Sequence, residues 1–328
     1  MASQRYLITG ALGCIGAWAT KSLLAEGAEV WSYDRPGKPH RLQLLLDDSA
    51  LGKVHFIDGD ITDEDVFERA VVENKISHIL HLAALQVPMV RANPVLGARV
   101  NVVGSTIVME TAKRHASQIE GLVYASSIAV YGPVSVYPPG PIAHDAEMLP
   151  TTLYGVNKMA DEWTAKIYWQ DYQVPSIGVR PFFVYGPARD QGMSSTPTKA
   201  MLAAAVGRPY HIPLTGSAVY QHAEDVANVV IRASKTTVAG APCYNLGGSK
   251  ATIDQVIDAI ELAAPEMEGK ISGGQGPSLF PEDMDQSALE SLLGKVEWRD
   301  FTGGVKGTIE FFRAAVAAGT LDVERAIS

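Results

Sequence analysis

Short apolar runs alternate with longer amphipathic segments over the first 180 residues of the chain. This alternation is typical of strands that are joined through crossover helices, and therefore of a parallel sheet. The sequence thus predicts an α/β fold with helices on both faces of one sheet. The expected strands are 5–9, 28–33, 53–57, 77–82, 121–125 and 176–180, and the expected helices are 14–26, 63–72, 95–115 and 156–172.

The regular alternation weakens beyond Arg180, where Pro, Gly and Ser interrupt the chain at 186–197 and 272–281. We therefore expect two parts, a first domain over 1–180 and a smaller α/β region over 181–328, with segments of the second able to cross back to the first. A length of 328 residues also suits two units. The helices expected in the second part are 198–206, 223–233, 253–263 and 305–317.

Composition excludes several classes of protein. Apolar residues make up 47% and charged residues 19%, which excludes disorder, and a net charge of −9 without basic runs argues against a nucleic-acid partner. The long uncharged stretches 6–20 and 121–143 are interrupted by glycines and by prolines, so no membrane segment is expected. Cys14 and Cys243 form neither a disulfide framework nor a metal site, which predicts a reducing, cytoplasmic location and no metal.

Gly10, Gly13 and Gly16 stand at three-residue spacing where the first expected strand gives way to its helix. Such a turn lets the backbone approach a diphosphate, and the helix behind it offers free amides. Glycines also serve tight strand-to-helix packing, so the motif alone is weak. Asp34, 18 residues after Gly16 at the end of the second strand, strengthens the dinucleotide interpretation because its carboxylate can accept from both ribose hydroxyls.

An acidic group at Asp34 repels the additional phosphate of NADP, so NAD is the expected cofactor. Arg35 and Arg41 are the residues that could offset this repulsion, and the sequence leaves that question open. Asp60 follows the third strand, where its carboxylate could meet adenine or cap the next helix.

Tyr154 and Lys158 are four residues apart, on one face of an expected helix. A phenol titrates at about pH 10 in water, so it needs a nearby positive charge to act as a base near neutral pH, and Lys158 can supply that charge. The same spacing occurs on many solvated helices. Ser127 follows the strand 121–125, at the sheet edge where open α/β folds place ligands, and it favours the catalytic interpretation.

Taken together, these motifs resemble the extended short-chain dehydrogenase/reductases of the NAD-dependent epimerase/dehydratase family, in order from Tyr6 to about Asp225. The resemblance implies a Rossmann-type doubly wound parallel sheet with a smaller C-terminal substrate-binding region, NAD as cofactor, and a homodimer formed through the helices at 95–115 and 156–172. It assigns catalysis to Ser127, Tyr154, Lys158 and Asn101. It assigns cofactor binding to Gly10, Gly13, Cys14, Ile15, Gly16, Asp34, Asp60, Ile61, Leu82, Ala83, Ala84, Tyr154 and Lys158.

Two positions depart from the members of this family that act on nucleotide sugars. Phe183 stands where those enzymes usually have an asparagine that touches the diphosphate, and Ala218 stands where they commonly have an arginine. A buried diphosphate without such donors is costly, so a smaller and less charged substrate is expected. The candidate substrate contacts are Phe183, Arg189 and His222. The non-functional alternatives are that Arg189 pairs with Asp190 and that His222 is a structural histidine.

The leading hypothesis is an enzyme that moves a hydride between NAD and a secondary hydroxyl carbon of a polyol, sugar or sugar acid. Tyr154 takes the hydroxyl proton, Lys158 supports it, Ser127 orients the oxygen, and Asn101 supports the helix or a proton-relay water. The alternatives are a nucleotide-sugar 4-epimerase with tightly bound NAD and a non-catalytic NAD-binding sensor. The sequence leaves the substrate, its stereochemistry and the direction of reaction open.

Overall fold

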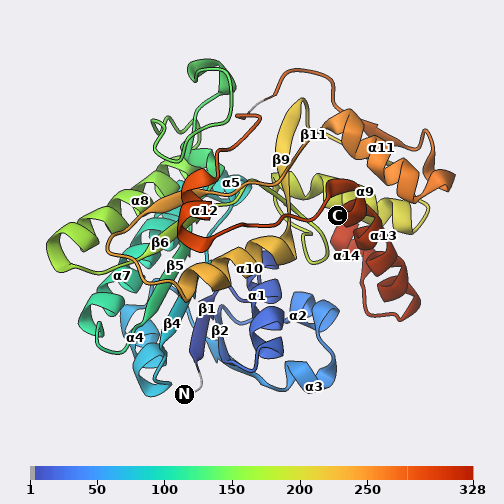
Figure 1. Cartoon of the computed structure of the whole chain (residues 1–328). Helices are drawn as coiled ribbons and strands as arrows, with labels where there is room; N and C mark the ends of the chain where they lie inside the picture. Colours follow the sequence, from blue (N-terminus) through green and yellow to red (C-terminus); the bar gives the residue numbers. More distant parts are fainter. Residues whose placement is uncertain (1–3, 279, 328) are drawn as a thin grey trace.

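A seven-stranded parallel sheet forms the centre of the computed structural model, which describes residues 4–278 and 280–327 (Figure 1). The strand order is β10-β6-β5-β4-β1-β2-β3, and every neighbouring pair is parallel. The expected α/β class and parallel sheet are confirmed. The strands are β1 (Arg5–Thr9), β2 (Glu29–Asp34), β3 (Val54–Asp58), β4 (His78–His81), β5 (Gly121–Ala125), β6 (Ile177–Arg180) and β10 (Cys243–Asn245).

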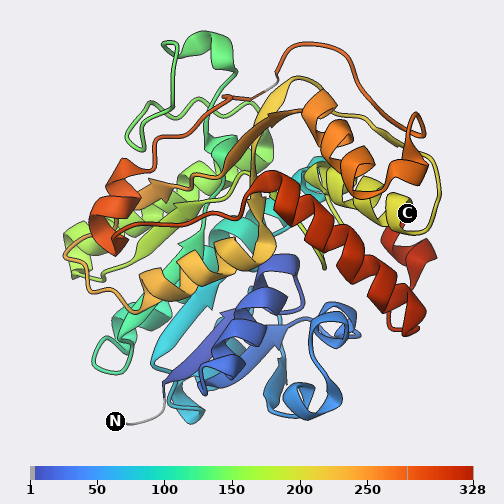
Figure 2. The same ribbon diagram turned by 45° about the vertical axis from the view of Figure 1, so that its right-hand side comes forward.

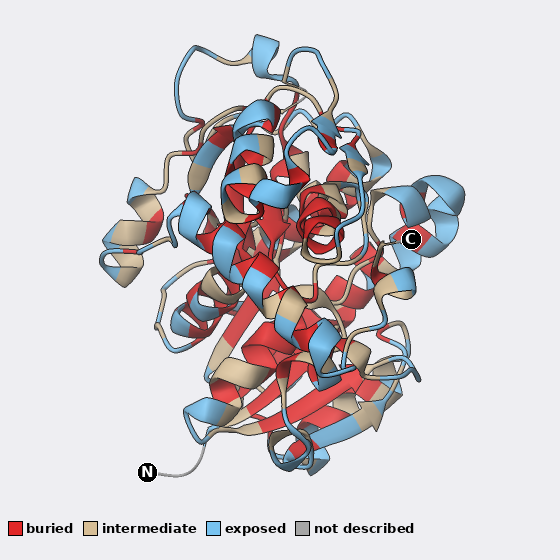
Figure 3. Ribbon diagram, turned by 90° about the vertical axis from the view of Figure 1, so that its right-hand side faces the viewer, coloured by how far each residue is buried: buried red, intermediate tan, exposed pale blue. Residues whose placement is uncertain are grey.

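Helices cover both faces of this sheet, and successive side chains along each strand pack alternately against the two helical layers. Tyr6 and Ile8 of β1 pack with the first helical layer, whereas Leu7 between them packs with the second. Both faces are therefore apolar, and the sheet interior is buried (Figure 3). The first layer contains α1 (Cys14–Ala25) and α10 (Ala223–Ser234), and the second contains α4 (Glu64–Glu73), α7 (Gly104–Arg114) and α8 (Leu153–Tyr172).

The chain reverses its direction across the sheet beside β1. It runs from β1 through β2 to β3 at one edge and then returns to place β4 on the other side of β1. Open α/β sheets bind ligands outside the carboxyl ends of the strands at such a switch point. Gly10 leaves β1 here with a φ of +71°, and a Cβ on it would lie 2.7 Å from the amide nitrogen of Ala83, so only glycine fits.

The helix expected at 95–115 consists of three consecutive segments. They are α6 (Pro94–Ala98), a π-helical turn (Arg99–Val103) and α7. A π-helical turn inside a longer helix is frequent at functional sites. The helix expected at 156–172 begins earlier, at Leu153, because the hydroxyl of Thr152 accepts a hydrogen bond from the amide of Gly155 at 3.0 Å.

A second core lies over the carboxyl edge of the central sheet (Figures 1 and 2). In the small sheet β11-β9-β7, β7 and β9 are parallel while β11 and β9 are antiparallel, and β8 pairs with β12 in parallel. The expected helices of this region are confirmed. Its elements are β7 (Phe183–Tyr185), β8 (Tyr210–Ile212), β9 (Ser217–His222), β11 (Ser249–Thr252), β12 (Ile271–Gly273), α9 (Thr196–Ala205), α11 (Ile253–Ala263) and α13 (Phe301–Ala317).

Two elements from the second half of the chain lie with the first half in space. Helix α10 packs on α1, and β10 extends the central sheet beside β6. No helix in the described part of the chain is long and apolar enough to cross a membrane. The remaining helices are short and were not expected. They are α2 (His40–Leu45), α3 (Asp48–Leu51), α5 (Val87–Ala92), α12 (Ser287–Leu293), α14 (Val323–Ile327) and 3-10 turns at 128–130, 134–136, 193–195 and 265–267.

Candidate active site

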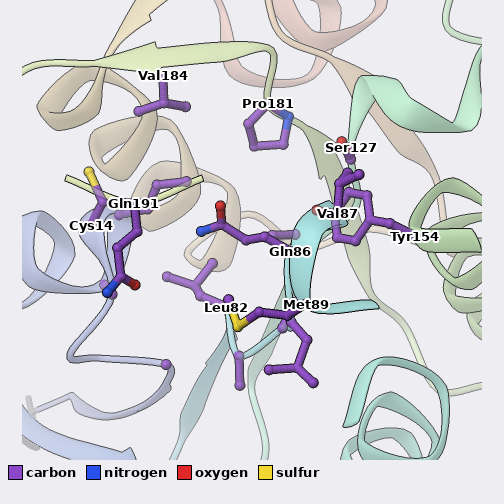
Figure 4. A pocket seen from close by; sticks show the side chains of 18 of the residues that line it. Cys14, Leu82, Gln86, Val87, Met89, Ser127, Tyr154, Pro181, Val184 and Gln191 are labelled. Carbon is purple, nitrogen blue, oxygen red and sulfur yellow. The ribbon is translucent and has the colours of Figure 1, made fainter. Parts of the chain in front are cut away.

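A cleft of about 550 Å³ opens at the carboxyl ends of the central strands, beneath the second core. Figure 4 shows Ser127 and Tyr154 at one end of the cleft and Cys14 at the other, with Leu82 and Gln86 between them. All of the residues that were expected to hold the cofactor line this cleft. The structure therefore brings together motifs that are spread over almost 150 residues of sequence.

The N-terminus of α1 faces the cleft with free backbone donors. Its N-cap, Gly13, has no side chain to accept a hydrogen bond, and no described residue accepts one from the amides of Cys14, Ile15 or Gly16. A Cβ on Gly16 would overlap the carbonyl oxygen of Gly10, so the turn stays narrow. Free amides and the positive end of the helix dipole suit the diphosphate of a dinucleotide.

Asp34 ends β2 on the opposite side of the glycine-rich turn. Its Oδ2 accepts from the amide of Leu12 at 3.0 Å, and its Oδ1 accepts from the amide of Arg35 at 2.8 Å. Burial raises the pKa of this carboxyl, and the two amides oppose that rise. Two bonds leave acceptor capacity on the carboxylate, which suits the hydroxyls of a ribose.

Arg41 also lines the cleft, but its guanidinium is already bonded to other groups. Its Nε and Nη2 lie 2.8 and 2.6 Å from Oδ1 of Asp190, and its Nη1 donates to the carbonyl oxygen of Leu12 at 2.7 Å. Arg35, in contrast, is exposed. Of the two cations that could admit NADP, only Arg35 therefore has a side chain free to do so.

Lys158 is held in a buried position by two acceptors. Its Nζ donates to the carbonyl oxygen of Ala125 at 2.8 Å and lies 3.1 Å from Oδ2 of Asp161. Burial alone would lower the pKa of Lys158, but the charges of Asp161 and of ionised Tyr154 outweigh it, and the pKa is raised. Lys158 is therefore an ammonium group at neutral pH.

Asp161 was not anticipated, although an acidic residue three positions after Lys158 on one helix is a visible signal. Burial raises the pKa of Asp161 to about 6, against the opposing charge of Lys158. Its folded-state pKa thus exceeds the ordinary value of 3.8. The protonated form consequently stabilises the fold below about pH 4, and this contribution is lost as the pH rises through about 6.

We expect kcat/KM of the wild-type protein to show an inflection near pH 6 that Asp161→Asn removes. Above this pH the carboxylate neutralises part of the charge of Lys158, and below it the ammonium is uncompensated. Initial rates between pH 5 and 8 would show the inflection, with Asp171→Asn on the exposed face of α8 as the matched control. Superimposable profiles for the wild type and Asp161→Asn would refute this role.

Ser126 and Ser127, directly after β5, have different hydrogen-bond partners. The hydroxyl of Ser126 donates to Oε1 of Glu162 at 2.5 Å, and Glu162 also forms a buried ion pair with Arg180 at 2.6 Å. Ser127 lines the cleft and accepts from the amide of Ala129 at 3.1 Å, which leaves its own proton free to donate. Ser127 is the serine that can bond a reacting oxygen.

Asn101 lies in the π-helical turn and does not line the cleft. It is fully buried, its Oδ1 accepts from the amide of Leu85 at 2.7 Å, and its Nδ2 donates to the carbonyl of Leu85 at 3.0 Å. The hydroxyl of Thr9 similarly accepts from the amides of Leu82 and Ala83, each at 3.2 Å. Asn101 therefore holds the wall of the cleft in place, and no contact with a substrate is open to it here.

His222 is not in the cleft either. Its ring packs edge-on against Trp18 and Tyr185, with centroids 5.6 and 5.4 Å away, and its Nδ1 accepts from the amide of Glu224 as the N-cap of α10. Burial lowers the pKa of His222 to about 3, so it is neutral. The position of His222 agrees with the alternative of a structural histidine and not with a substrate contact, because packing and capping occupy the ring.

The other two candidate substrate residues, Phe183 and Arg189, both line the cleft. The ring of Phe183 stands edge-on to those of Phe182 and Phe280, at 5.2 and 5.9 Å, and the three form an aromatic wall. The alternative pairing of Arg189 with Asp190 is wrong, because Asp190 is bonded to Arg41 and Arg325 instead.

Sequence reasoning missed several residues that line the cleft, among them Gln86, Gln191 and Phe280. Gln86 lies near the middle of the cleft and Gln191 lies toward the end that holds Cys14 (Figure 4). Phe280 completes the aromatic wall. Gln86 could have been found because it follows the expected cofactor segment directly. Gln191 and Phe280 lie in segments without periodicity and carried no signal. No cluster of three or more His, Cys, Asp or Glu in the described ranges could hold a metal ion.

Comparison with known proteins agrees with this geometry. The model of the NAD-dependent epimerase/dehydratase family matches residues 6–247. This chain belongs to that family. It is an NAD-dependent enzyme of the extended short-chain dehydrogenase type.

Individual relatives match nearly the whole chain. The UDP-glucose 4-epimerase of Mycolicibacterium smegmatis is 29% identical, with 94% of this chain and 99% of the relative covered. The structure of UDP-glucose 4-epimerase from Thermus thermophilus in complex with NAD is 27% identical, with a TM-score of 0.78 and coverage of 95% and 100%. L-threonine dehydrogenase from Clostridium difficile shares the fold at 20% identity, with a TM-score of 0.82 and coverage of 98% and 100%.

We expect the enzyme to bind NAD more tightly than NADP, and Asp34→Ala to narrow that preference. The carboxylate of Asp34 would repel the additional phosphate, and Arg41 is bonded to Asp190 and Leu12. Calorimetric titration with both dinucleotides measures the ratio of affinities, with Arg35→Ala as the companion variant. Equal affinities in the wild type would mean that Arg35 offsets Asp34.

Proposed function

We propose that this enzyme transfers a hydride between NAD and a secondary hydroxyl carbon of a small carbohydrate-like substrate that carries no nucleotide. NAD supplies the hydride acceptor or donor when it is bound. The proposal adds the substrate class and the roles of individual residues to the family and the NAD dependence of the enzyme. The aromatic wall around Phe183 is the observation that carries it.

Two side chains act on the substrate oxygen in this proposal, and a third supports the phenol. Tyr154 takes the hydroxyl proton, and Ser127 donates a hydrogen bond to the same oxygen. Lys158 stays protonated beside them through Asp161 and Ala125, so a positive charge is held next to the phenol. These residues line one end of the cleft, which supports a shared role.

The aromatic wall argues against a diphosphate at the substrate end of the cleft. Phe182, Phe183 and Phe280 provide no hydrogen-bond donor from their side chains, and a buried dianion without donors is costly. The C–H face of a sugar ring, in contrast, is apolar and can pack on such rings. A monosaccharide or its acid therefore suits this wall better than a nucleotide sugar does.

A nucleotide-sugar 4-epimerase is the second candidate. The full-length similarity to the UDP-glucose 4-epimerase of Mycolicibacterium smegmatis favours it. The same three residues could serve both reactions, since an epimerase returns the hydride to the other face of the carbon. The two candidates differ in whether NADH leaves the protein and in whether a nucleotide is bound.

The proposed function is tested by NADH formation. The purified protein with NAD is offered a panel of polyols, free sugars and sugar acids, and NADH is followed by fluorescence. Steady NADH production with a free polyol, sugar or sugar acid supports the proposal. Interconversion of a nucleotide sugar without NADH release would support the epimerase instead.

We also propose that the protein is a homodimer through the helices expected for that role. Helices α6 and α8 expose large apolar side chains on one side, and α7 packs against α8. Val156, Trp163 and Ile167 of α8 recur at helical spacing and are 41%, 53% and 44% exposed. Val95 of α6 is 66% exposed. Exposed apolar stripes of this kind mark contact surfaces.

Trp163→Glu should convert the dimer to a monomer, because it places a charge in the centre of the proposed apolar contact. Light scattering at micromolar concentration measures the mass. Leu262→Glu is the matched control, since Leu262 is 71% exposed on the surface of α11, a helix of the region around the second core rather than of the proposed contact. A monomeric wild type would refute the proposal.

A further inference from the structure

Four cationic side chains line the cleft in the described part of the chain, and three of them are accounted for. Arg41 is bonded to Asp190, and Lys158 is bonded to Asp161. Arg35 is exposed beside Asp34. The fourth, Arg189, forms no ion pair with any described carboxylate, although its Nε is fully buried.

The guanidinium of Arg189 has N–H donors that are not used in hydrogen bonds to described residues. Its Nη2 donates to the hydroxyl of Ser194 at 2.6 Å, and no described residue accepts a hydrogen bond from Nε. Burial lowers the pKa of Arg189, the charge of Arg41 lowers it further, and the charge of Asp190 opposes both effects. A buried cation without an anion is costly, and an anion that entered the cleft would remove the cost.

The loop after β7 holds Arg189 in place. Ala188, directly before it, has a φ of +72°, a strained conformation for a residue with a Cβ, and the amide of Arg189 donates to the carbonyl of Gly186 at 3.1 Å. The backbone of Gly192 packs so closely on Gln86 that a Cβ there would overlap the side-chain oxygen of Gln86. Strain next to a charged side chain in a cleft points to a functional constraint.

Two anions could meet this guanidinium, the diphosphate of NAD and an acid group of the substrate. The diphosphate already has the free amides of Cys14, Ile15 and Gly16 at the start of α1. Arg189, in contrast, follows the strand that carries Phe183. The planar fork of arginine matches a carboxylate with two parallel hydrogen bonds.

We propose that Arg189 binds the carboxylate of the substrate and that the enzyme acts on small sugar acids. The apolar face of the ring then packs on Phe183, and the reacting hydroxyl meets Tyr154 and Ser127. This inference rests on the proposed function, because it places the acid in the same cleft and leaves the hydride transfer unchanged. It adds the substrate class, a sugar acid that carries no nucleotide.

The test compares acids with neutral sugars that differ only in the acid group, such as galacturonate with galactose and glucuronate with glucose. One measurement is kcat/KM with NAD. The other is the binding of each compound to the complex with NADH, followed by NADH fluorescence, which needs no turnover. The variants are Arg189→Gln, which removes the charge, and Arg189→Lys, which keeps the charge but loses the fork. Arg208→Gln is the matched control, since Arg208 pairs with Glu324 away from the cleft.

We expect the wild type to prefer each acid, and Arg189→Gln to weaken acid binding about 10- to 100-fold while the affinity for NADH stays within about threefold. Arg189→Lys should retain an intermediate preference for acids over neutral sugars. This second variant keeps the test valid if Arg189→Gln fails to fold. Acid binding to the NADH complex without any oxidation would uphold this subsite and contradict the proposed function.

Three results would overturn the inference. The first is oxidation of neutral sugars and acids at equal kcat/KM, which would leave the proposed function standing. The second is an acid preference that survives Arg189→Gln, or no acid binding at all. The third is a tenfold loss of NADH affinity in Arg189→Gln with an unchanged ratio of acid to neutral sugar, which would assign Arg189 to the cofactor diphosphate.

Discussion

Replacing Tyr154 with phenylalanine should lower kcat by about 10²- to 10⁴-fold, the range expected when a positioned general base is removed. The affinity for NADH should change little, because the substitution removes one oxygen and keeps the ring. The contacts that hold Lys158, to Ala125 and Asp161, do not involve the phenol. Steady-state rates and NADH fluorescence titrations on the same preparation separate the two effects.

Tyr172→Phe is the control for this substitution. Tyr172 ends the same helix, α8, and is 50% exposed, so its hydroxyl is away from the cleft. This variant should retain wild-type rates. Near-full activity in Tyr154→Phe would show that another group takes the proton and would remove Tyr154 from the catalytic role.

We expect UDP and UDP-glucose to bind weakly to this protein. Their affinities should be about two to four powers of ten lower than in a site that has hydrogen-bond donors for the phosphates at positions 183 and 218. Phe183 replaces one expected donor and Ala218 the other, and each lost charge-assisted bond is worth roughly 1.5–3 kcal/mol. The structure also limits which other cations could replace the missing phosphate donors. Lys199 and Arg208 do not line the cleft, and Arg208 is paired with Glu324 on the surface.

Titration with UDP, UDP-glucose and a free sugar acid in the presence of NAD tests this prediction. Binding of the free acid without binding of UDP is the expected result. Micromolar binding of UDP would contradict it and favour the 4-epimerase. If UDP binds, Arg189→Gln shows whether Arg189, which forms no ion pair with a described carboxylate, supplies the missing donor.

The sheet and the cofactor end of the cleft follow from local sequence. Each strand is a short apolar run, and in a parallel sheet the carboxyl ends of all strands meet at one edge. Motifs that directly follow strands, such as Gly10 after β1 and Asp34 at the end of β2, are therefore placed together without any knowledge of long-range contacts. The pair Tyr154 and Lys158 is equally local, because helical spacing sets it.

Packing decided between alternatives that the local sequence left open. Asn101 and His222 are polar residues next to functional segments, which made them candidates. In the folded protein, Leu85 bonds both polar side-chain atoms of Asn101. The ring nitrogens of His222 meet the amide of Glu224 and the guanidinium of Arg299, and neither side chain lines the cleft. A sequence shows which groups can form hydrogen bonds, but competition for those groups is settled by packing.

What the sequence by itself determined is the parallel α/β fold, the glycine-rich turn after the first strand and the family, because these depend on periodicity and on spacings of a few residues. Only the tertiary structure decided the substrate end of the cleft. Arg41 meets Asp190 across 149 residues, Phe280 joins Phe183 from a segment without regular structure, and Arg189 is left without an anionic partner among the described residues. Such contacts depend on how the second core docks on the first, and docking leaves no periodic signal in the chain.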